Sequence, residues 1–143
     1  MPAESWVRAF QVDDEAEVIA LWGRCELLRP WNDPHKDIQR KLAVQPELFL
    51  VAGLGSRIVG TAMGGYDGHR GSVYYLAVDP AQQGSGVGRE LMRQLELRLI
   101  ELGCPKLNLL VRTTNLKVQG FYKAIGYEPQ DVACLGKRLI PDE

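Results

Sequence analysis

A glycine-rich turn between an apolar segment and an amphipathic helix is the feature that most restricts the fold of this sequence. The apolar segment 73–78 is followed shortly by the hexapeptide Gln-Gly-Ser-Gly-Val-Gly at 83–88. From Val87 to Leu102, leucine and methionine side chains repeat on one helical face and charged side chains occupy the other. This strand, turn and helix predict an α/β domain. The first N–H groups of a helix have no partner within it, so the turn also predicts an anion site.

Three interpretations of this turn are open. The first is purely structural, with glycines that tighten the entry to a helix. The second is a dinucleotide-binding turn, but the last interval between Gly84, Gly86 and Gly88 is one residue too short for the Gly-x-Gly-x-x-Gly fingerprint. The third is a cradle for the phosphate groups of another ligand. The turn has no Gly-Lys-Ser/Thr ending, which argues against a P-loop nucleotidase.

The rest of the chain reads as alternating elements of one domain over residues 1–143. Apolar runs predict strands, with one or two more in the last part of the chain: 6–10, 48–52, 58–63, 73–78, 107–112 and 127–139. Helical spacing and caps predict helices that begin near Asp13, Asp33, Val87 and Leu116, the first of them stopping at Pro30. The hairpin signal at 53–57 predicts antiparallel pairing, and the crossover to 107–112 predicts parallel pairing with 73–78. We expect a mixed central sheet of about six to seven strands flanked by about four helices.

Composition and charge exclude several classes of function. The 143 residues are 45% hydrophobic, which suits one globular domain. Seventeen Lys and Arg against 18 Asp and Glu leave a formal charge of −1, so no nucleic acid or anionic membrane is expected as a partner. No apolar run approaches membrane-spanning length, and the amino terminus lacks the apolar core of a secretory peptide. We therefore expect a cytoplasmic protein.

The cysteines and histidines do not predict a metal site. Cys25, Cys104 and Cys134 are odd in number and far apart, so neither a disulfide framework nor a zinc site is indicated. They are interpreted as buried thiols, and a nucleophilic role would lack a histidine at a recognisable spacing. His35 and His69 are the two histidines of the chain. We expect no metal cofactor.

The strand and turn together resemble the acetyl-CoA signature of the GNAT N-acetyltransferase superfamily. The resemblance rests on Leu-Ala-Val-Asp-Pro at 76–80, on Gln83-x-x-Gly86-x-Gly88, and on the helix that follows. It implies that backbone amides of the turn hold the CoA pyrophosphate and that the preceding strand binds the pantetheine arm. The residues that it assigns to acetyl-CoA are Leu76, Ala77, Val78, Gln83, Gly84, Ser85, Gly86, Val87, Gly88, Arg89 and Asn115.

A second element of the same family lies between Asn115 and Tyr127. Its Asn, Phe-Tyr and Gly-Tyr residues resemble the GNAT pattern, which implies that Asn115 bonds the pantetheine region and that Tyr122 is the general acid toward the CoA sulfur. A phenol of pKa near 10 can deliver a proton to a thiolate of pKa near 8.5 as charge develops. From spacing alone, Tyr122 is a core aromatic beside Phe121 and Asn115 is a helix N-cap.

The chain looks closest to the bacterial YpeA-type members of the superfamily. Two segments carry this resemblance, Leu-Leu-Arg-Pro-Trp-Asn-Asp-Pro at 27–34 and Gly-Gly-Tyr-Asp-Gly-His-Arg-Gly at 64–71. Loops carry specificity in such scaffolds, so these two segments are expected to contact the acceptor. The candidate substrate-binding residues are Arg29, Trp31, Asn32, Asp67, His69 and Arg70.

The resemblance leaves the general base open. Leu110 stands where the ribosomal-protein alanine acetyltransferase branch has a catalytic Glu. Deprotonation of the amine could instead pass through water or use one of the loop residues Glu26, Asp33, Asp67 and His69. The expected reaction is direct acetyl transfer from acetyl-CoA to a primary amine, on a small molecule or a peptide, in a ternary complex. A non-catalytic acyl-CoA sensor is the alternative, and a homodimer is compatible with the sequence.

Overall fold

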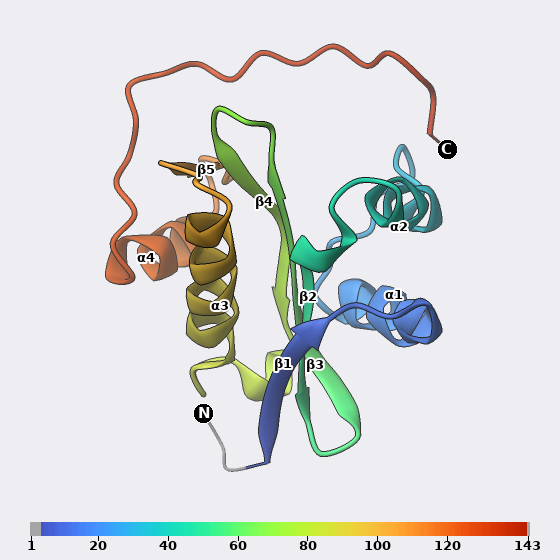
Figure 1. The fold of residues 1–143 in the computed structure, drawn as a ribbon. Helices are drawn as coiled ribbons and strands as arrows, with labels where there is room; N and C mark the ends of the chain where they lie inside the picture. Colours follow the sequence, from blue (N-terminus) through green and yellow to red (C-terminus); the bar gives the residue numbers. More distant parts are fainter. Residues whose placement is uncertain (1–3, 143) are drawn as a thin grey trace. The chain divides into compact units, whose positions relative to one another are not determined.

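The computed structural model describes residues 4–142, which form two compact units. Residues 4–109 together with Asp142 form the first unit, and residues 110–141 form the second. In the first unit a twisted mixed sheet carries helices on both faces, with α1 and α2 on one side and α3 on the other (Figure 1). The strand and the glycine turn of the sequence signature both belong to this unit.

The sheet of the first unit has five strands in the order β1-β2-β3-β4-β5. Antiparallel pairing joins β1 to β2, β2 to β3 and β3 to β4, whereas β4 and β5 are parallel. The predicted hairpin and the predicted parallel crossover are therefore confirmed. The strand bounds are β1 (Ser5–Ala9), β2 (Phe49–Leu54), β3 (Arg57–Tyr66), β4 (Gly71–Val78) and β5 (Leu107–Leu109).

The prediction of six to seven strands is wrong for the part of the chain that the structure describes. No strand is formed between 127 and 139, and β5 ends at Leu109 rather than extending to 112. Apolar side chains in the last segment are largely exposed, with Leu135 at 92%. A strand needs a neighbouring edge to satisfy its backbone groups, and an apolar run alone does not supply that edge.

Four α-helices are present in the described residues, as expected: α1 (Glu15–Arg24), α2 (Pro34–Leu42), α3 (Val87–Glu101) and α4 (Leu116–Ala124). The first helix ends well before Pro30, because Glu26 adopts a left-handed φ of 59° just after the helix. Leu28, expected on the helix, is consequently outside it and 39% exposed. Short 3-10 turns complete the elements: η1 (Val12–Asp14), η2 (Pro46–Leu48) and η3 (Pro80–Gln82).

Aromatic side chains form the core between the sheet and α1. Trp22 and Phe49 are fully buried, and Phe49 stacks on Phe10 with ring centroids 4.5 Å apart. On the opposite face α3 approaches β3 closely at Gly64, where an added Cβ would lie 2.3 Å from Leu95 Cδ1. Close packing on both faces holds β4 and the start of α3 in fixed relation within this unit.

None of the helices in the described part of the chain is long and apolar enough to cross a membrane. Cys25 and Cys104 are half-buried, whereas Cys134 is exposed, so the expectation of three buried thiols is wrong for Cys134. The neighbouring residues 128–141 are exposed as well.

Candidate functional site

The glycine-rich turn has a backbone that only glycine adopts readily. Gly84 and Gly86 have φ values of 85° and 91°, and Gly86 is the N-cap residue of α3. A Cβ added at Gly84 would meet nothing within 4 Å, so backbone conformation, not crowding, calls for glycine there. The same observation shows that the space beside Gly84 is open toward a ligand.

The start of α3 presents N–H groups that the helix itself does not use. The first bond of the helical ladder joins Glu90 N–H to Gly86 O at 3.1 Å, and the N–H groups before it have no acceptor inside the helix. The helix dipole adds positive potential at this end. Arg93 holds the Glu90 carboxylate at 2.6 and 2.9 Å and lowers the pKa of Glu90 to about 2. The negative charge of Glu90, in the first turn of α3, is therefore paired with Arg93 one turn further along the helix.

Asp79 ties the turn to the sheet and to α1. Its Oδ1 accepts from Ala81 N at 3.0 Å, and its Oδ2 accepts from Arg24 at 2.9 and 3.2 Å. Its own N–H donates to Val59 O at 2.8 Å. Asp79 is 5% exposed, and the Ala81 amide, followed by Arg24, lowers the pKa of its carboxyl. The Asp-Pro pair of the sequence signature therefore positions the turn through buried contacts.

The strand before the turn has an open edge. Parallel pairing with β5 ends at Val73 and Leu109, so in the described structure residues 74–78 have no strand partner on that side. At the end of this edge Gln83 Nε2 and Cys25 Sγ both donate to Val78 O at 3.3 Å. Burial raises the pKa of the Cys25 thiol, which argues against a reactive thiolate there. Peptide groups along such an edge can bind an extended ligand that contains amides.

A bulge at Tyr75 interrupts the other edge of β4. Tyr75 has a left-handed φ of 51°, and the pairing register of β3 with β4 shifts between Thr61 and Met63. The carbonyl of Tyr75 accepts from Thr61 Oγ1 at 2.7 Å, and Thr61 Oγ1 accepts from Trp22 Nε1 at 2.9 Å. The Tyr75 ring stacks on Trp22 at 3.8 Å. Sequence reasoning missed Tyr75, because no local signal marks a left-handed tyrosine inside a strand.

The segment 27–34 brings one of its three candidate residues to this bulge. Asn32 Nδ2 donates to the Tyr75 hydroxyl at 3.0 Å and to Asp37 Oδ2 at 2.5 Å. Arg29 instead donates to carbonyls of its own segment at 2.7 and 2.9 Å. Trp31 is 50% exposed. Asn32 is therefore the candidate of this segment whose side chain contacts β4, and Asp37 is a polar partner that sequence reasoning missed.

The loop between β3 and β4 is organised by Asp67. Its Oδ1 accepts from the N–H groups of His69 and Arg70 at 2.7 and 2.8 Å, and these bonds lower the pKa of Asp67. The Arg70 side chain donates to His69 O at 2.9 Å. This loop precedes the first residue of β4, whereas the glycine turn follows the last. The structure thus places Asp67, His69 and Arg70 at the end of β4 remote from the turn.

The three carboxylates that are candidates for the general base, Glu26, Asp33 and Asp67, have different surroundings. Asp33 caps α2, with Oδ1 accepting from His35 N at 2.9 Å. Glu26 is exposed at the end of α1, and Asp67 holds its own loop. The prediction that Asp33 begins a helix is confirmed. Its carboxylate caps α2 and accepts a backbone hydrogen bond there.

Tyr122 and Asn115 lie in the second unit. Asn115 is the N-cap of α4 and accepts from Val118 N at 3.2 Å. Tyr122 is 7% exposed, with edge contacts to the rings of Phe121 and Tyr127 at 5.2 and 5.5 Å. Burial raises the pKa of the Tyr122 phenol, which keeps it protonated at neutral pH. Their roles toward CoA stay predictions.

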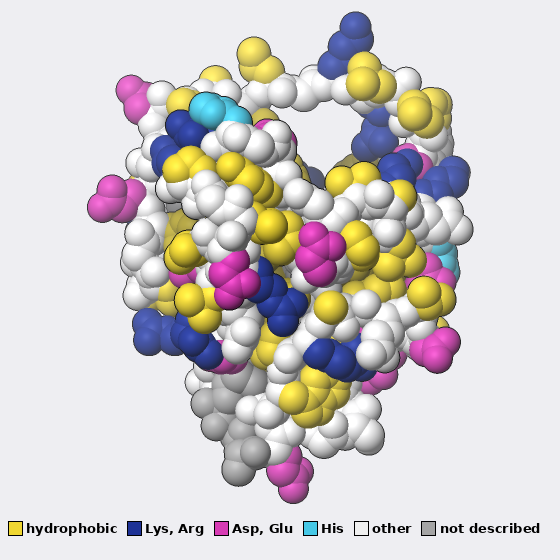
Figure 2. All heavy atoms as spheres, viewed as in Figure 1, with side chains coloured by type: hydrophobic (Ala, Val, Ile, Leu, Met, Phe, Trp, Pro, Cys, Tyr) yellow, Lys and Arg dark blue, Asp and Glu magenta, His cyan; other side chains and the backbone are white. Residues whose placement is uncertain are grey.

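Figure 2 shows how the charged side chains are distributed over one face of the molecule. On the face in Figure 2, acidic and basic side chains are interspersed, with hydrophobic ones between them. Among residues 4–142, no group of three or more His, Cys, Asp or Glu side chains could hold a metal ion. A ligand anion therefore depends on local geometry such as the turn.

Comparison with known proteins gives the family. The model of the Acetyltransferase (GNAT) family matches residues 9–127. A protein named acetyltransferase from Yersinia pestis is 58% identical over 137 residues, covering 96% of this chain and 97% of that one. The fold is similar to that of the ribosomal-protein-S18-alanine N-acetyltransferase from Escherichia coli, at a TM-score of 0.72, 22% identity, and 85% and 76% coverage.

A second solved structure extends the similarity over the whole chain. AAC(6')-Iy in complex with the bisubstrate analog CoA-S-monomethyl-acetylneamine gives a TM-score of 0.79 at 16% identity, covering 96% of this chain and 100% of that one. The expected fold class is confirmed, and the expectation of an acetyl-CoA-dependent N-acetyltransferase is confirmed at the level of the family. The chain belongs to the GNAT family of acetyltransferases.

Proposed function

We propose that this protein transfers the acetyl group of acetyl-CoA to a primary amine by direct attack in a ternary complex. One observation carries the proposal: an open strand edge at 74–78 leads directly into a glycine turn and the N-terminus of α3. The edge suits the amides of pantetheine, and the turn suits the pyrophosphate. We propose further that both units act as one domain of residues 1–143, as a cytoplasmic enzyme.

Residues of the turn and strand would bind the cofactor through their main chain. Pyrophosphate oxygens would accept from N–H groups at the start of α3, where Gly84 leaves room for close approach and Gly86 has the left-handed φ that the turn needs. The thioester would lie along Leu76, Ala77 and Val78, with a main-chain N–H near Ala77 or Val78 polarising its carbonyl. Such donors stabilise the oxyanion that forms when the amine attacks.

The protein's own proton donor would be Tyr122. The uncharged amine nitrogen attacks the thioester carbon, the carbon–sulfur bond breaks, and the sulfur leaves with the electron pair. The proton that the nitrogen loses as the amide forms would pass to water. The Tyr122 phenol is protonated at neutral pH, as a phenol ordinarily is, and it would give its proton to that sulfur as negative charge develops there. No acyl-enzyme residue is needed, because both substrates are held at once. Asn115, which caps α4 through Oδ1, keeps its amide N–H groups for the pantetheine.

The proposal is tested by binding and by thiol release. Calorimetry should show binding of CoA and none of NAD, and acetyl-CoA should release free thiol in the presence of a competent primary amine. CoA binding without thiol release for any amine in a broad panel would favour the non-catalytic sensor. NAD binding without a response to CoA would reject the proposal.

A matched pair of variants tests the turn. Gly86→Asp places a carboxylate in the anion site, and we expect CoA affinity to fall by roughly tenfold or more. Gly103→Asp is the control, since Gly103 has a similar left-handed φ, 86° against 91° at Gly86, and lies just beyond the other end of α3. Calorimetry measures both, with circular dichroism to show that they are folded. Equal CoA affinity in the two folded variants would remove the turn from the binding site.

A further inference from the structure

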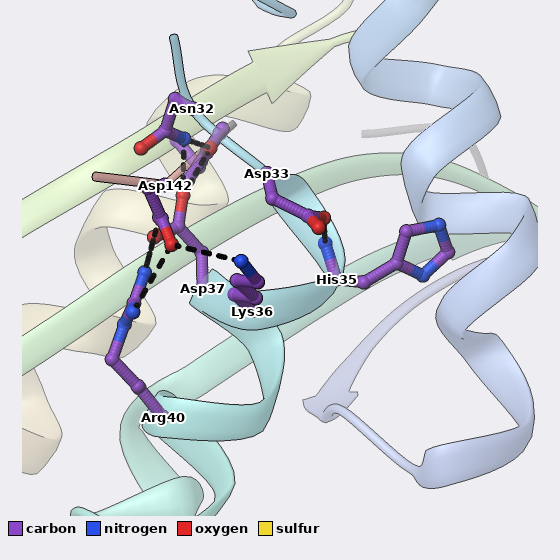
Figure 3. Close-up of polar contacts among 8 residues, drawn as sticks. Asn32, Asp33, His35, Lys36, Asp37, Arg40 and Asp142 are labelled. Atoms are coloured by element: carbon purple, nitrogen blue, oxygen red, sulfur yellow. Dashed lines mark hydrogen bonds and ion pairs between the residues drawn. The ribbon is translucent and has the colours of Figure 1, made fainter. Parts of the chain in front are cut away.

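Six polar side chains from separate parts of the sequence meet beside α2 in the first unit. Figure 3 shows Asn32, before the helix, and Asp142, near the other end of the chain, converging on residues of α2. A short parallel bridge joins Asn32 to Asp142. The cluster consists of Asn32, Lys36, Asp37, Arg40, Tyr75 and Asp142, and we refer to it as the α2 cluster.

Asp37 is the centre of the α2 cluster. The Tyr75 hydroxyl donates to Asp37 Oδ2 at 2.6 Å, and Asn32 Nδ2 donates to the same oxygen at 2.5 Å. Arg40 donates to Asp37 Oδ1 at 3.1 Å. A carboxylate can accept about four hydrogen bonds, so the donors found among the described residues leave capacity on Oδ1. The Asp37 side chain is 21% exposed, so this oxygen pair is within reach of a ligand.

The two carboxylates of the α2 cluster, Asp37 and Asp142, differ in the cations that contact them. Arg40 lies 2.5 and 3.4 Å from the oxygens of Asp142, and Lys36 lies 3.9 Å from it. Both cations therefore contact Asp142, which is 3% exposed. Among residues 4–142, the cation that contacts Asp37 is Arg40, through one bond from a side chain that is 55% exposed and that also binds Asp142. Solvent weakens such a pair, so Asp37 keeps attraction for another cation.

Tyr75 connects Asp37 to the strand on which the thioester is proposed to lie. Its ring is held against Trp22 of α1 and its carbonyl is held by Thr61, so the hydroxyl has little freedom. The next residues along β4 are 76–78. Tyr75 and the α2 cluster lie on the α1 and α2 face of the sheet, whereas α3 covers the other face (Figure 1). An acceptor on this side would reach the strand without crossing the proposed pyrophosphate site.

We propose that Asp37 binds the ammonium group of the acceptor, with Asn32 and Tyr75 as the positioning residues that orient its carboxylate. The inference rests on the proposed function and names its substrate class, a cationic primary amine rather than a neutral or anionic acceptor. An ammonium carries a full positive charge and N–H donors, one of which can fill the open acceptor position on Asp37 Oδ1. Asn32 and Tyr75 act through Asp37 and make the site geometry rigid.

Binding of a small cation tests the site without any turnover. The probe is n-propylammonium, titrated into CoA-saturated protein, with 1-propanol as its uncharged counterpart. The side-chain amide of Asn32 is the reporter in ¹⁵N-correlated NMR spectra, because it touches Asp37 directly. We expect n-propylammonium to shift this signal in a saturable manner and 1-propanol to leave it in place. No saturable shift in the wild-type protein would overturn the proposal.

Two variants assign the effect to Asp37. Asp37→Asn keeps the size and removes the charge, and we expect n-propylammonium to bind about tenfold or more weakly. Glu15→Gln is the control, because Glu15 is a partly exposed carboxylate near the start of α2, 3.7 Å from His35. Equal affinity in wild type and Asp37→Asn would overturn the proposal. If Asp37→Asn is not folded by circular dichroism, Tyr75→Phe replaces it, with the same expectation of weaker binding.

Turnover supplies an independent check. For an amine that the enzyme acetylates, Asp37→Asn should raise KM by about tenfold or more, with a smaller change in kcat and unchanged CoA affinity. A KM equal to that of wild type would contradict the assignment. If no amine in the panel is acetylated, the proposed function fails while the NMR titration still decides whether Asp37 binds ammonium.

Discussion

Replacing Thr61 by valine tests whether the contacts around the Tyr75 bulge hold the site together. Thr61 is completely buried, and its hydroxyl is the link between two groups. It accepts from Trp22 Nε1 at 2.9 Å and donates to Tyr75 O at 2.7 Å. Valine has nearly the same shape as threonine, so the main effect of the change is the loss of the two hydrogen bonds that the hydroxyl makes.

The expected cost follows from what each partner loses. Trp22 is fully buried, so its N–H is left without an acceptor, at about 1–3 kcal/mol. Tyr75 O is partly buried and loses one hydrogen bond, at about 0.5–1.5 kcal/mol. Burial of a methyl group in place of the hydroxyl returns about 0.8 kcal/mol. We therefore expect the free energy of unfolding to fall by about 1–4 kcal/mol.

Urea denaturation followed by tryptophan fluorescence measures this loss. With a urea slope of about 1–3 kcal/mol/M, a loss near the middle of the range lowers the midpoint by about 1 M or more. Thr114→Val is the control: Thr114 is exposed, and we expect a change within about 0.5 kcal/mol. If the Thr61→Val midpoint equals that of the control, the link does not stabilise the bulge and the reasoning is refuted.

Two further predictions concern the proton donor and the acid stability. Tyr122→Phe keeps the ring beside Phe121 and Tyr127 and deletes the hydroxyl, so CoA affinity should change little while turnover falls by roughly 10²-fold to 10⁴-fold. Steady-state thiol release measures the turnover of the variant. If Tyr122→Phe turns over at the wild-type rate under conditions where chemistry is shown to limit the rate, the general-acid role is rejected. Asp79 has a pKa below its ordinary value of 3.8, so its contribution to stability is present above that value and is lost as the pH falls through the lowered pKa. Urea midpoints measured from neutral pH downward should therefore converge for wild type and Asp79→Asn, and parallel curves would contradict this.

The segments with strong local patterns were predicted well. The helical repeat from Val87 gives α3, and Asp33 followed by proline gives the start of α2. The hairpin of β2 and β3 follows from two apolar runs separated by a glycine-containing turn. These predictions succeeded because spacing, caps and turn residues act over a few neighbouring positions.

The errors fall where partners distant in sequence decide the outcome. The apolar residues between 127 and 139 resemble strands, yet the described structure pairs them with no edge. Cys134 is predicted to be buried because free cysteines usually are, and it is exposed. The left-handed backbone of Tyr75 was also missed, because the stack on Trp22 and the bond from Thr61 stabilise it from other elements.

The sequence by itself determined the fold class, the family and the glycine turn, because these depend on local backbone preferences and short motifs. Only the tertiary structure decided that Asp37 meets Tyr75 and that Arg40 meets Asp142, a partner 102 positions away. Such contacts arise when packing of the sheet and helices brings separate segments together. No local preference records them, since each carboxylate or arginine alone is typical of a solvated surface.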